Sequence, residues 1–158
     1  ELAKAEALLM KWKKNIAKFD VDEAKRGLDS GEFFIVQQYS GDILQIIEEN
    51  ENIGFFYPAE GTSYSSDDFV IMKDSKNIDL AYEFINFCHN PQICAENMEF
   101  VFYMSPNSEA LKLLDKETLN NPAFKPSDAV MKKSETIVDL GEDNKKYSKI
   151  WDEIKSGK

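Results

Sequence analysis

Short apolar runs alternate with helix-spaced segments along this chain, and this alternation constrains the fold more than any other feature. The run at residues 33–36 is continuous and rich in Phe, Ile and Val, which is typical of a strand buried on both faces. Residues 53–57 and 69–72 have a similar character and are also predicted as strands, and residues 100–104 are predicted as a strand or a turn. Strands that alternate with helices predict an α/β protein.

The helical segments are recognised by apolar residues that recur at the spacing of one helix face. Helices are predicted over residues 2–14, from Gly41-Asp42, over 78–90, from Pro91, from Ser108 and over about 142–155. Proline suits the first position of a helix because that position has no backbone partner to lose. The expected core residues of the second and last helices are Ile43, Leu44, Ile46, Ile47, Tyr147, Ile150, Trp151 and Ile154.

Composition and charge restrict the classes of partner. The 158 residues carry a net charge of −10, which disfavours the phosphates of DNA and RNA. No apolar run is long enough to span a bilayer. The chain opens at Glu1 without an initiator Met or a signal peptide, so further sequence is expected upstream. Cys88 and Cys94 lie among apolar helix positions and are predicted to be buried free thiols, with a disulfide between them as the alternative.

Three polar stretches fall at the ends of predicted strands, at residues 38–42, 58–62 and 67–68. They place Tyr39 and Asp67 on short turns, where α/β proteins bind small ligands. An aromatic face beside a carboxylate suits a compact organic cation. The residues alone also allow structural roles: Tyr39 as an ordinary strand-end aromatic, Asp67 in a solvated turn, and Tyr103 in the core.

An ordered set of motifs resembles one known family. The motifs are Tyr39-Ser40-Gly41-Asp42, Pro58-Ala59-Glu60-Gly61-Thr62, Asp67 before Phe69-Val70-Ile71, Lys76-Asn77 before Ala81, Phe84-Ile85-Asn86-Phe87, Pro91, and Tyr103 before Pro106-Asn107. In this order and at this spacing they resemble the spermidine/putrescine-binding proteins, which are extracytoplasmic receptors of polyamine ABC transporters. The resemblance covers essentially the whole chain and corresponds to the carboxyl-terminal half of such a receptor.

The resemblance implies a periplasmic-binding-protein-like fold of type II, with two α/β lobes and a ligand cleft between them. Residues 1–65 are then expected in the carboxyl-terminal lobe, residues 66–110 in the amino-terminal lobe, and residues 111–158 again in the carboxyl-terminal lobe. The upstream part of the amino-terminal lobe is missing from this chain. Residues 66–110 would therefore need missing strands, a partner chain or a rearrangement to bury their apolar face, so self-association or domain exchange is an expectation.

The resemblance also assigns candidate ligand-binding residues. Tyr39 corresponds to a cleft aromatic that stacks on the polyamine, Asp67 to a carboxylate that pairs with an amine, and Tyr103 to an aromatic that lines the methylene chain. Ser65 stands where relatives usually carry Trp, which removes one aromatic face and leaves the identity of the polyamine open. Glu135 is a weak candidate for the last-loop glutamine that binds ligand in some relatives.

The predicted function is polyamine binding for delivery to an ABC transporter permease, by a periplasmic protein or a cell-surface lipoprotein. A receptor for ferric iron or a different organic cation is the alternative. An enzyme with paired carboxylates ranks last, because the neighbouring Asp67 and Asp68 would point to opposite sides of an extended segment. The chain is therefore predicted not to be an enzyme, and no metal, cofactor or nucleic acid is expected.

Overall fold

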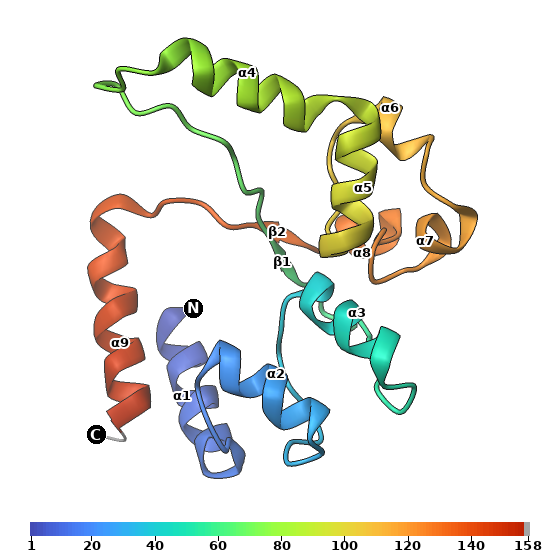
Figure 1. Cartoon of the computed structure of the whole chain (residues 1–158). Helices are drawn as coiled ribbons and strands as arrows, with labels where there is room; N and C mark the ends of the chain where they lie inside the picture. The colour runs from blue at the N-terminus through green and yellow to red at the C-terminus, as the bar shows by residue number, and fades with distance from the viewer. Residues whose placement is uncertain (157–158) are drawn as a thin grey trace. The chain divides into compact units, whose positions relative to one another are not determined.

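A computed structural model of the chain describes residues 1–156 and is mostly helical (Figure 1). The helical elements are α1 Leu2–Trp12, η1 Lys13–Asn15, α2 Val21–Asp29, α3 Ser40–Glu49, α4 Ile78–His89, α5 Pro91–Val101, α6 Ser108–Leu111, α7 Lys116–Asn120, α8 Asp128–Met131, η2 Gly141–Asp143 and α9 Asn144–Ser156. The strands are β1 Ser63–Tyr64 and β2 Glu135–Thr136, which pair in parallel. The chain divides into two compact units, one formed by Glu1–Gln38 with the described part of Ile137–Lys158, the other by Tyr39–Thr136.

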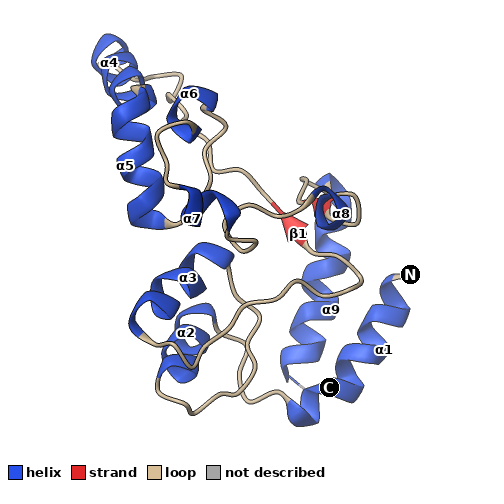
Figure 2. Cartoon of the chain, turned by 90° about the vertical axis from the view of Figure 1, so that its right-hand side faces the viewer, coloured by secondary structure: helices blue, strands red, loops and turns tan. Residues whose placement is uncertain are grey.

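In the first unit, helices α1 and α9 lie side by side (Figures 1 and 2). Ile154 of α9 is almost fully buried, as its helical spacing predicted. The ammonium of Lys13 donates to the carbonyl oxygens of Ile154 and, at 2.8 Å, of Lys155. A basic side chain at this end of α9 satisfies carbonyls that have no partner within the helix and complements the helix dipole.

Helix α2 belongs to the same unit and begins at a capping aspartate. The Asp20 carboxylate accepts a hydrogen bond from the backbone N–H of Glu23 at 2.9 Å. The Gln38 side chain donates to the Val21 carbonyl at 2.7 Å, which ties the segment after α2 back to its first turn. The rings of Phe19 and Trp151 pack edge to face, with their centroids 5.1 Å apart.

The core of the second unit forms where α3, α5 and α6 meet the segment after α7. Its buried members are Leu44, Cys94, Ala95, Met98, Ala110, Leu114, Ala123 and Phe124. The prediction that Pro91 begins a helix is confirmed, because α5 starts there and the Asn90 side chain caps it by accepting from the N–H of Gln92 at 3.0 Å. Cys94 is buried and Cys88 half-buried, and both thiols are free.

The predicted strands at 33–36, 53–57 and 69–72 are wrong for this structure, and so is a strand at 100–104. The first three segments are extended or turn-forming chain outside any strand, and residues 100 and 101 complete helix α5. A strand needs a hydrogen-bonded neighbour, and among residues 1–156 the described pairing joins only β1 to β2. The α/β character expected from the sequence is therefore present only as this short parallel pair among helices.

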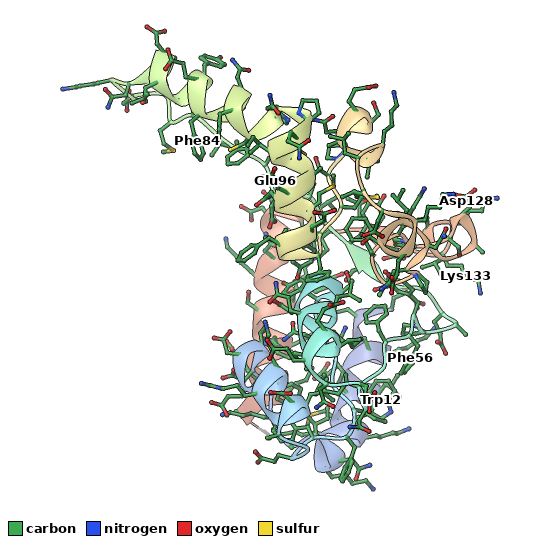
Figure 3. All side chains as sticks on the ribbon, turned by 45° about the vertical axis from the view of Figure 1, so that its right-hand side comes forward. Trp12, Phe56, Phe84, Glu96, Asp128 and Lys133 are labelled. Atoms are coloured by element: carbon green, nitrogen blue, oxygen red, sulfur yellow. The ribbon has the colours of Figure 1, made fainter. Side chains whose placement is uncertain are left out.

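The segments that fail to form strands leave apolar side chains in solvent. Phe34 is 92% exposed and Ile35 83% exposed, in contrast to the burial that their continuous apolar run predicted. Residues 69–72 lie beside α4, where the rings of Phe69 and Phe84 meet edge to face at 5.9 Å (Phe84 is labelled in Figure 3). Both rings remain more than half exposed. These segments thus leave part of their apolar surface in solvent, although Phe55 packs against the core of the second unit.

Candidate functional site

The first turn of α3 is anchored by buried residues further along the same helix. Ile43, Leu44 and Ile46 are buried as predicted, and they anchor one face of α3 in the second unit. Tyr39 precedes the helix in an extended conformation and is 58% exposed. The first N–H groups of a helix lack partners within it and carry partial positive charge, so they attract oxygen acceptors. The turn from Tyr39 to Asp42 therefore presents fixed donors beside an exposed aromatic ring.

Tyr103 reaches this turn from the end of α5. Phe102 ends that helix in the left-handed conformation, with φ 57°, and so redirects the chain just before Tyr103. The Tyr103 hydroxyl accepts a hydrogen bond from the backbone N–H of Asp42 at 3.3 Å. Its ring lies so close to Gly41 that a Cβ there would come within 2.5 Å of Tyr103 Cε2. Gly41 is therefore required by the close approach of this ring to the helix.

The pKa of the Tyr103 phenol depends on its burial and on three other residues, Asp42, Tyr39 and Asp67. Burial raises the pKa of the Tyr103 phenol most, and the Asp42 carboxylate raises it further. Tyr39 and Asp67 raise the pKa of Tyr103 by smaller amounts, while the hydrogen bond from the Asp42 backbone opposes the rise. Tyr39 and Asp67, which are far from Tyr103 along the chain, therefore each act electrostatically on Tyr103. We call these three residues together with Asp42 the α3 cluster.

The raised pKa values of two phenols predict how stability depends on pH. Burial also raises the pKa of Tyr57, against a smaller lowering by a hydrogen bond from Ser40. Because the unfolded chain loses these protons first, their stabilisation is full below pH of about 10 and is lost as the pH rises through the folded values. We expect the urea midpoint of unfolding to fall as the pH rises above about 10, and to fall less steeply in Tyr103→Phe. Equal slopes for the two proteins would contradict the raised pKa of the Tyr103 phenol.

Ser65 and Glu135 lie at the parallel strand pair rather than at α3. Ser65 directly follows β1, and Glu135 opens β2, where it is the partner of Ser63. Paired residues of neighbouring strands share a face, and residues two apart in one strand also share it. Glu135 and Ser63 therefore lie on the same face of the strand pair. Ser65 follows β1 at this end of the pair, two residues before Asp67. Ser65 and Glu135 are both exposed.

The Pro58–Thr62 motif holds this strand pair together. Gly61 closes a turn by donating to the Pro58 carbonyl at 3.1 Å, and it has φ +115°, a conformation that favours glycine. The ammonium of Lys133, which follows α8 (Figure 3), donates to the Ala59 carbonyl at 2.8 Å. The Glu135 N–H then donates to the Thr62 carbonyl at 2.9 Å. The motif thus has a structural role, since it joins the chain before Ser65 to the chain before Glu135.

Asp42, a member of the α3 cluster, and Tyr57 were not predicted from the sequence as parts of a functional site. Asp42 was predicted only to open a helix, but its carboxylate also acts on Tyr103 and its N–H donates to the Tyr103 hydroxyl. Tyr57 was interpreted only as the end of an apolar run, and the structure places its hydroxyl beside Ser40 and the Ala123 carbonyl. A tyrosine at the end of an otherwise apolar run indicates a buried hydroxyl that needs a hydrogen-bond partner elsewhere in the fold.

Residues 1–156 contain neither a cluster of candidate metal ligands nor a helix that could span a membrane. No group of three or more His, Cys, Asp or Glu side chains in this range is arranged to hold a metal ion. No helix described there has the length and apolar character needed to cross a membrane.

The chain is similar to named proteins along almost its whole length. It is 33% identical over 165 aligned positions to the putrescine-binding periplasmic protein SpuD of Pseudomonas aeruginosa, covering 100% of this chain and 45% of that protein. It is 30% identical to the putrescine-binding periplasmic protein PotF of Escherichia coli, covering 96% of this chain and 43% of the relative. It is 27% identical to the spermidine/putrescine-binding periplasmic protein of Salmonella typhimurium, covering 100% and 45%.

The chain therefore spans less than half the length of the curated relatives it matches. Residues 1–126 also match the model of a family described as bacterial extracellular solute-binding protein. A match over this share of the chain establishes membership, and the chain belongs to the bacterial extracellular solute-binding protein family.

Proposed function

We propose that this chain contributes part of a polyamine-binding site in a solute receptor. The observation that carries the proposal is the packing of Tyr103 on the first turn of α3, where its hydroxyl accepts from the Asp42 N–H and its ring lies against Gly41. Tyr39 directly precedes this turn, and the Asp67 carboxylate acts electrostatically on Tyr103. Relatives named for putrescine and spermidine binding support the choice of ligand. The proposed contacts are Asp67 and Asp42 with ammonium groups, and Tyr39 and Tyr103 with methylenes and ammonium faces.

The chemistry of a polyamine matches these groups. A polyamine is a chain of methylenes with ammonium groups at set spacing, so it needs carboxylates for its charges and flat apolar walls for its carbons. A cation over an aromatic face contributes roughly 0.5–2 kcal/mol, and a charge-assisted hydrogen bond about 1.5–3 kcal/mol. Two or three such contacts with apolar burial account for a micromolar Kd, which corresponds to about 8 kcal/mol.

Ser65 and Glu135 are proposed to border this site from the strand pair. Ser65 offers a hydroxyl where relatives usually carry an aromatic ring, so one wall of the site is smaller and more polar here. Glu135 is proposed to supply a further carboxylate on the same edge. A ligand with an ammonium near this edge would then be favoured over one with only a methylene there.

Ferric iron is the second candidate, because tyrosines beside carboxylates are oxygen ligands that suit a hard cation. Tyr57 and Tyr103 lie near the same helix start, which favours this alternative. Metal ligands must, however, lose their protons, and the raised pKa of both phenols opposes that loss. We therefore rank ferric binding below polyamine binding.

The wider setting is proposed from the family. Membership implies a periplasmic-binding-protein-like fold, and we propose the two-lobed type II form with residues 1–65 and 111–158 in one lobe and 66–110 in the other. The proposed partner is the membrane permease of an ABC transporter, with the receptor in the periplasm or anchored as a lipoprotein. The exposed rings of Phe69 and Phe84 would suit burial by the rest of such a receptor, or by self-association.

A pair of substitutions at Tyr39 tests the proposed stacking contact. Tyr39→Ala is expected to weaken putrescine binding by about threefold to thirtyfold, the equivalent of one cation–π contact, whereas Tyr39→Phe keeps the ring and changes the affinity little. Isothermal titration calorimetry on the protein made from the complete reading frame that contains this chain measures both. Equal losses in the two variants would assign a hydrogen-bonding role to the hydroxyl and overturn the stacking role.

A further inference from the structure

Gly41 is the second residue of α3 and is buried against the ring of Tyr103. A Cβ at this position would come within 2.5 Å of Cε2, 2.6 Å of Cζ and 2.7 Å of Cδ2 of that ring. The backbone of Gly41 is helical, so glycine is required here for space and not for an unusual φ. Glycine is also less favourable within a helix than alanine. The ring of Tyr103, and not the helix, therefore explains this glycine.

The backbone on both sides of Tyr103 is held by Met98, a core residue of the second unit that is 1% exposed. The Phe102 N–H donates to the Met98 carbonyl at 2.9 Å, and the Ser105 N–H donates to the Met98 sulfur at 3.1 Å. These two bonds fix the chain immediately before and shortly after Tyr103. A Cβ at position 41 would therefore have to be accommodated by turning the Tyr103 side chain away from α3.

The Tyr103 hydroxyl also acts as an acceptor for the start of α3. The residue at the N-cap position, Tyr39, makes no side-chain cap hydrogen bond, and the Asp42 N–H donates to the Tyr103 hydroxyl at 3.3 Å. The first N–H groups of a helix have no partner within it, so this bond supplies an acceptor that a capping side chain usually provides. The ring and the first turn of α3 therefore hold each other in place.

We propose that Gly41 is a positioning residue for ligand binding. Because it carries no side chain, the Tyr103 ring rests on the first turn of α3, and this contact fixes the direction in which the ring meets a polyamine. The inference rests on the proposed function, in which Tyr103 lines the methylene chain, and Gly41 itself does not contact the ligand. In Gly41→Ala the ring would turn away and the Asp42 N–H would lose its acceptor.

The test measures putrescine binding by calorimetric titration in Gly41→Ala, Tyr103→Ala and the double variant, each made from the complete reading frame. Gly41→Ala is expected to weaken binding by about threefold to thirtyfold, the equivalent of one cation–π contact. In the double variant, Gly41→Ala should add little to the loss caused by Tyr103→Ala, because the ring that it displaces is absent. Unchanged affinity in Gly41→Ala, or losses that add up in the double variant, would overturn the inference.

Gly27→Ala is the matched control. Gly27 is a buried glycine within α2, and a Cβ there would come within 2.3 Å of Cδ2 of Phe33. This variant adds the same methyl group against an aromatic ring, but neither Gly27 nor Phe33 is a proposed ligand contact. Gly27→Ala should therefore bind putrescine as the parent does. An equal loss of affinity in Gly27→Ala and Gly41→Ala would assign the loss to general destabilisation and overturn the inference.

Hydrogen exchange of the Asp42 N–H, followed by NMR, reports the position of Tyr103 without any ligand. Exchange should quicken in Gly41→Ala and in Tyr103→Ala, because both remove the hydroxyl acceptor, and it should match the parent in Gly27→Ala. An affinity loss in Gly41→Ala without faster exchange at Asp42 would also overturn the inference.

Two further variants keep the test decisive if Gly41→Ala fails to fold. The double variant with Tyr103→Ala should then recover the fold, because it removes the clash, and a double variant that stays unfolded would overturn the role of the ring. Tyr103→Phe loses the acceptor without adding an atom, and it should quicken exchange at Asp42 and weaken binding by about threefold to tenfold. A parent protein that binds no polyamine would overturn the proposed function instead, and exchange at Asp42 would then decide alone whether Gly41 positions Tyr103.

Discussion

Asp67→Asn is expected to weaken putrescine and spermidine binding by about tenfold to a hundredfold. The substitution keeps the shape of the side chain but removes the charge that pairs with an ammonium, and a charge-assisted hydrogen bond is worth about 1.5–3 kcal/mol. Asp67 is exposed and acts on Tyr103 only at a distance, so the free energy of unfolding should change little. Calorimetric titration measures the affinity, and urea unfolding measures the stability.

The neighbouring Asp68 provides a matched control for this prediction. It is also exposed and lies one residue further along the same segment, where extended chain directs its side chain to the opposite side. Asp68→Asn removes the same charge from the protein, so it corrects for any effect of net charge on a cationic ligand. Equal losses of affinity in the two variants would show that long-range charge, not contact with Asp67, attracts the ligand.

Gly61→Ala is expected to destabilise the chain by about 2–5 kcal/mol. Gly61 has φ +115°, and a Cβ added there would come within 2.2 Å of the Lys133 carbonyl oxygen. The clash is with backbone, so no side-chain rotation relieves it. The expected consequence is loss of the β1–β2 pairing, and with it displacement of Ser65 and Glu135.

Gly54→Ala is the corresponding control for Gly61→Ala. Nothing lies within 4 Å of a Cβ at Gly54, and no unusual φ is required there. This variant should therefore be neutral or slightly stabilising, by reducing the freedom of the unfolded chain. Urea midpoints for both variants, with circular dichroism to follow the fold, test the pair. A Gly61→Ala protein as stable as Gly54→Ala would contradict the close approach of Gly61 to Lys133.

Helices were predictable from this sequence because their signals are local. Ile43, Leu44 and Ile46 recur at helix spacing, and the structure buries all three. Asn90-Pro91 likewise carries its own start signal, a capping side chain followed by a residue that needs no N–H partner. Such features are complete within a few residues and do not depend on distant parts of the chain.

The strands were not predictable in the same way, because a strand depends on its neighbours. Phe33-Phe34-Ile35-Val36 has the composition of a buried strand, yet Phe34 and Ile35 lie in solvent without a partner strand among the described residues. The two-residue strands that do form, Ser63–Tyr64 and Glu135–Thr136, are too short and polar to give a sequence signal. Their pairing depends on the turn at Gly61, more than 70 residues before β2.

The candidate site contains residues that were predicted from the sequence and residues that were not. Tyr39, Asp67 and Tyr103 were selected through a family resemblance, and the electrostatic effect of Tyr39 and Asp67 on Tyr103 became visible only in three dimensions. Asp42 and Tyr57 were missed because their partners are remote in sequence: Tyr103 for Asp42, and Ala123 for Tyr57. A sequence marks which residues need a partner, whereas the fold decides which partner each one meets.

Calorimetric titration of the protein made from the complete reading frame with putrescine, spermidine and ferric citrate tests the central claim most directly. The α3 cluster predicts a single saturable site for at least one of the two polyamines, with a micromolar or lower Kd, and no comparable heat with ferric citrate. Heat with ferric citrate alone, or with none of the three, would contradict polyamine binding by this chain.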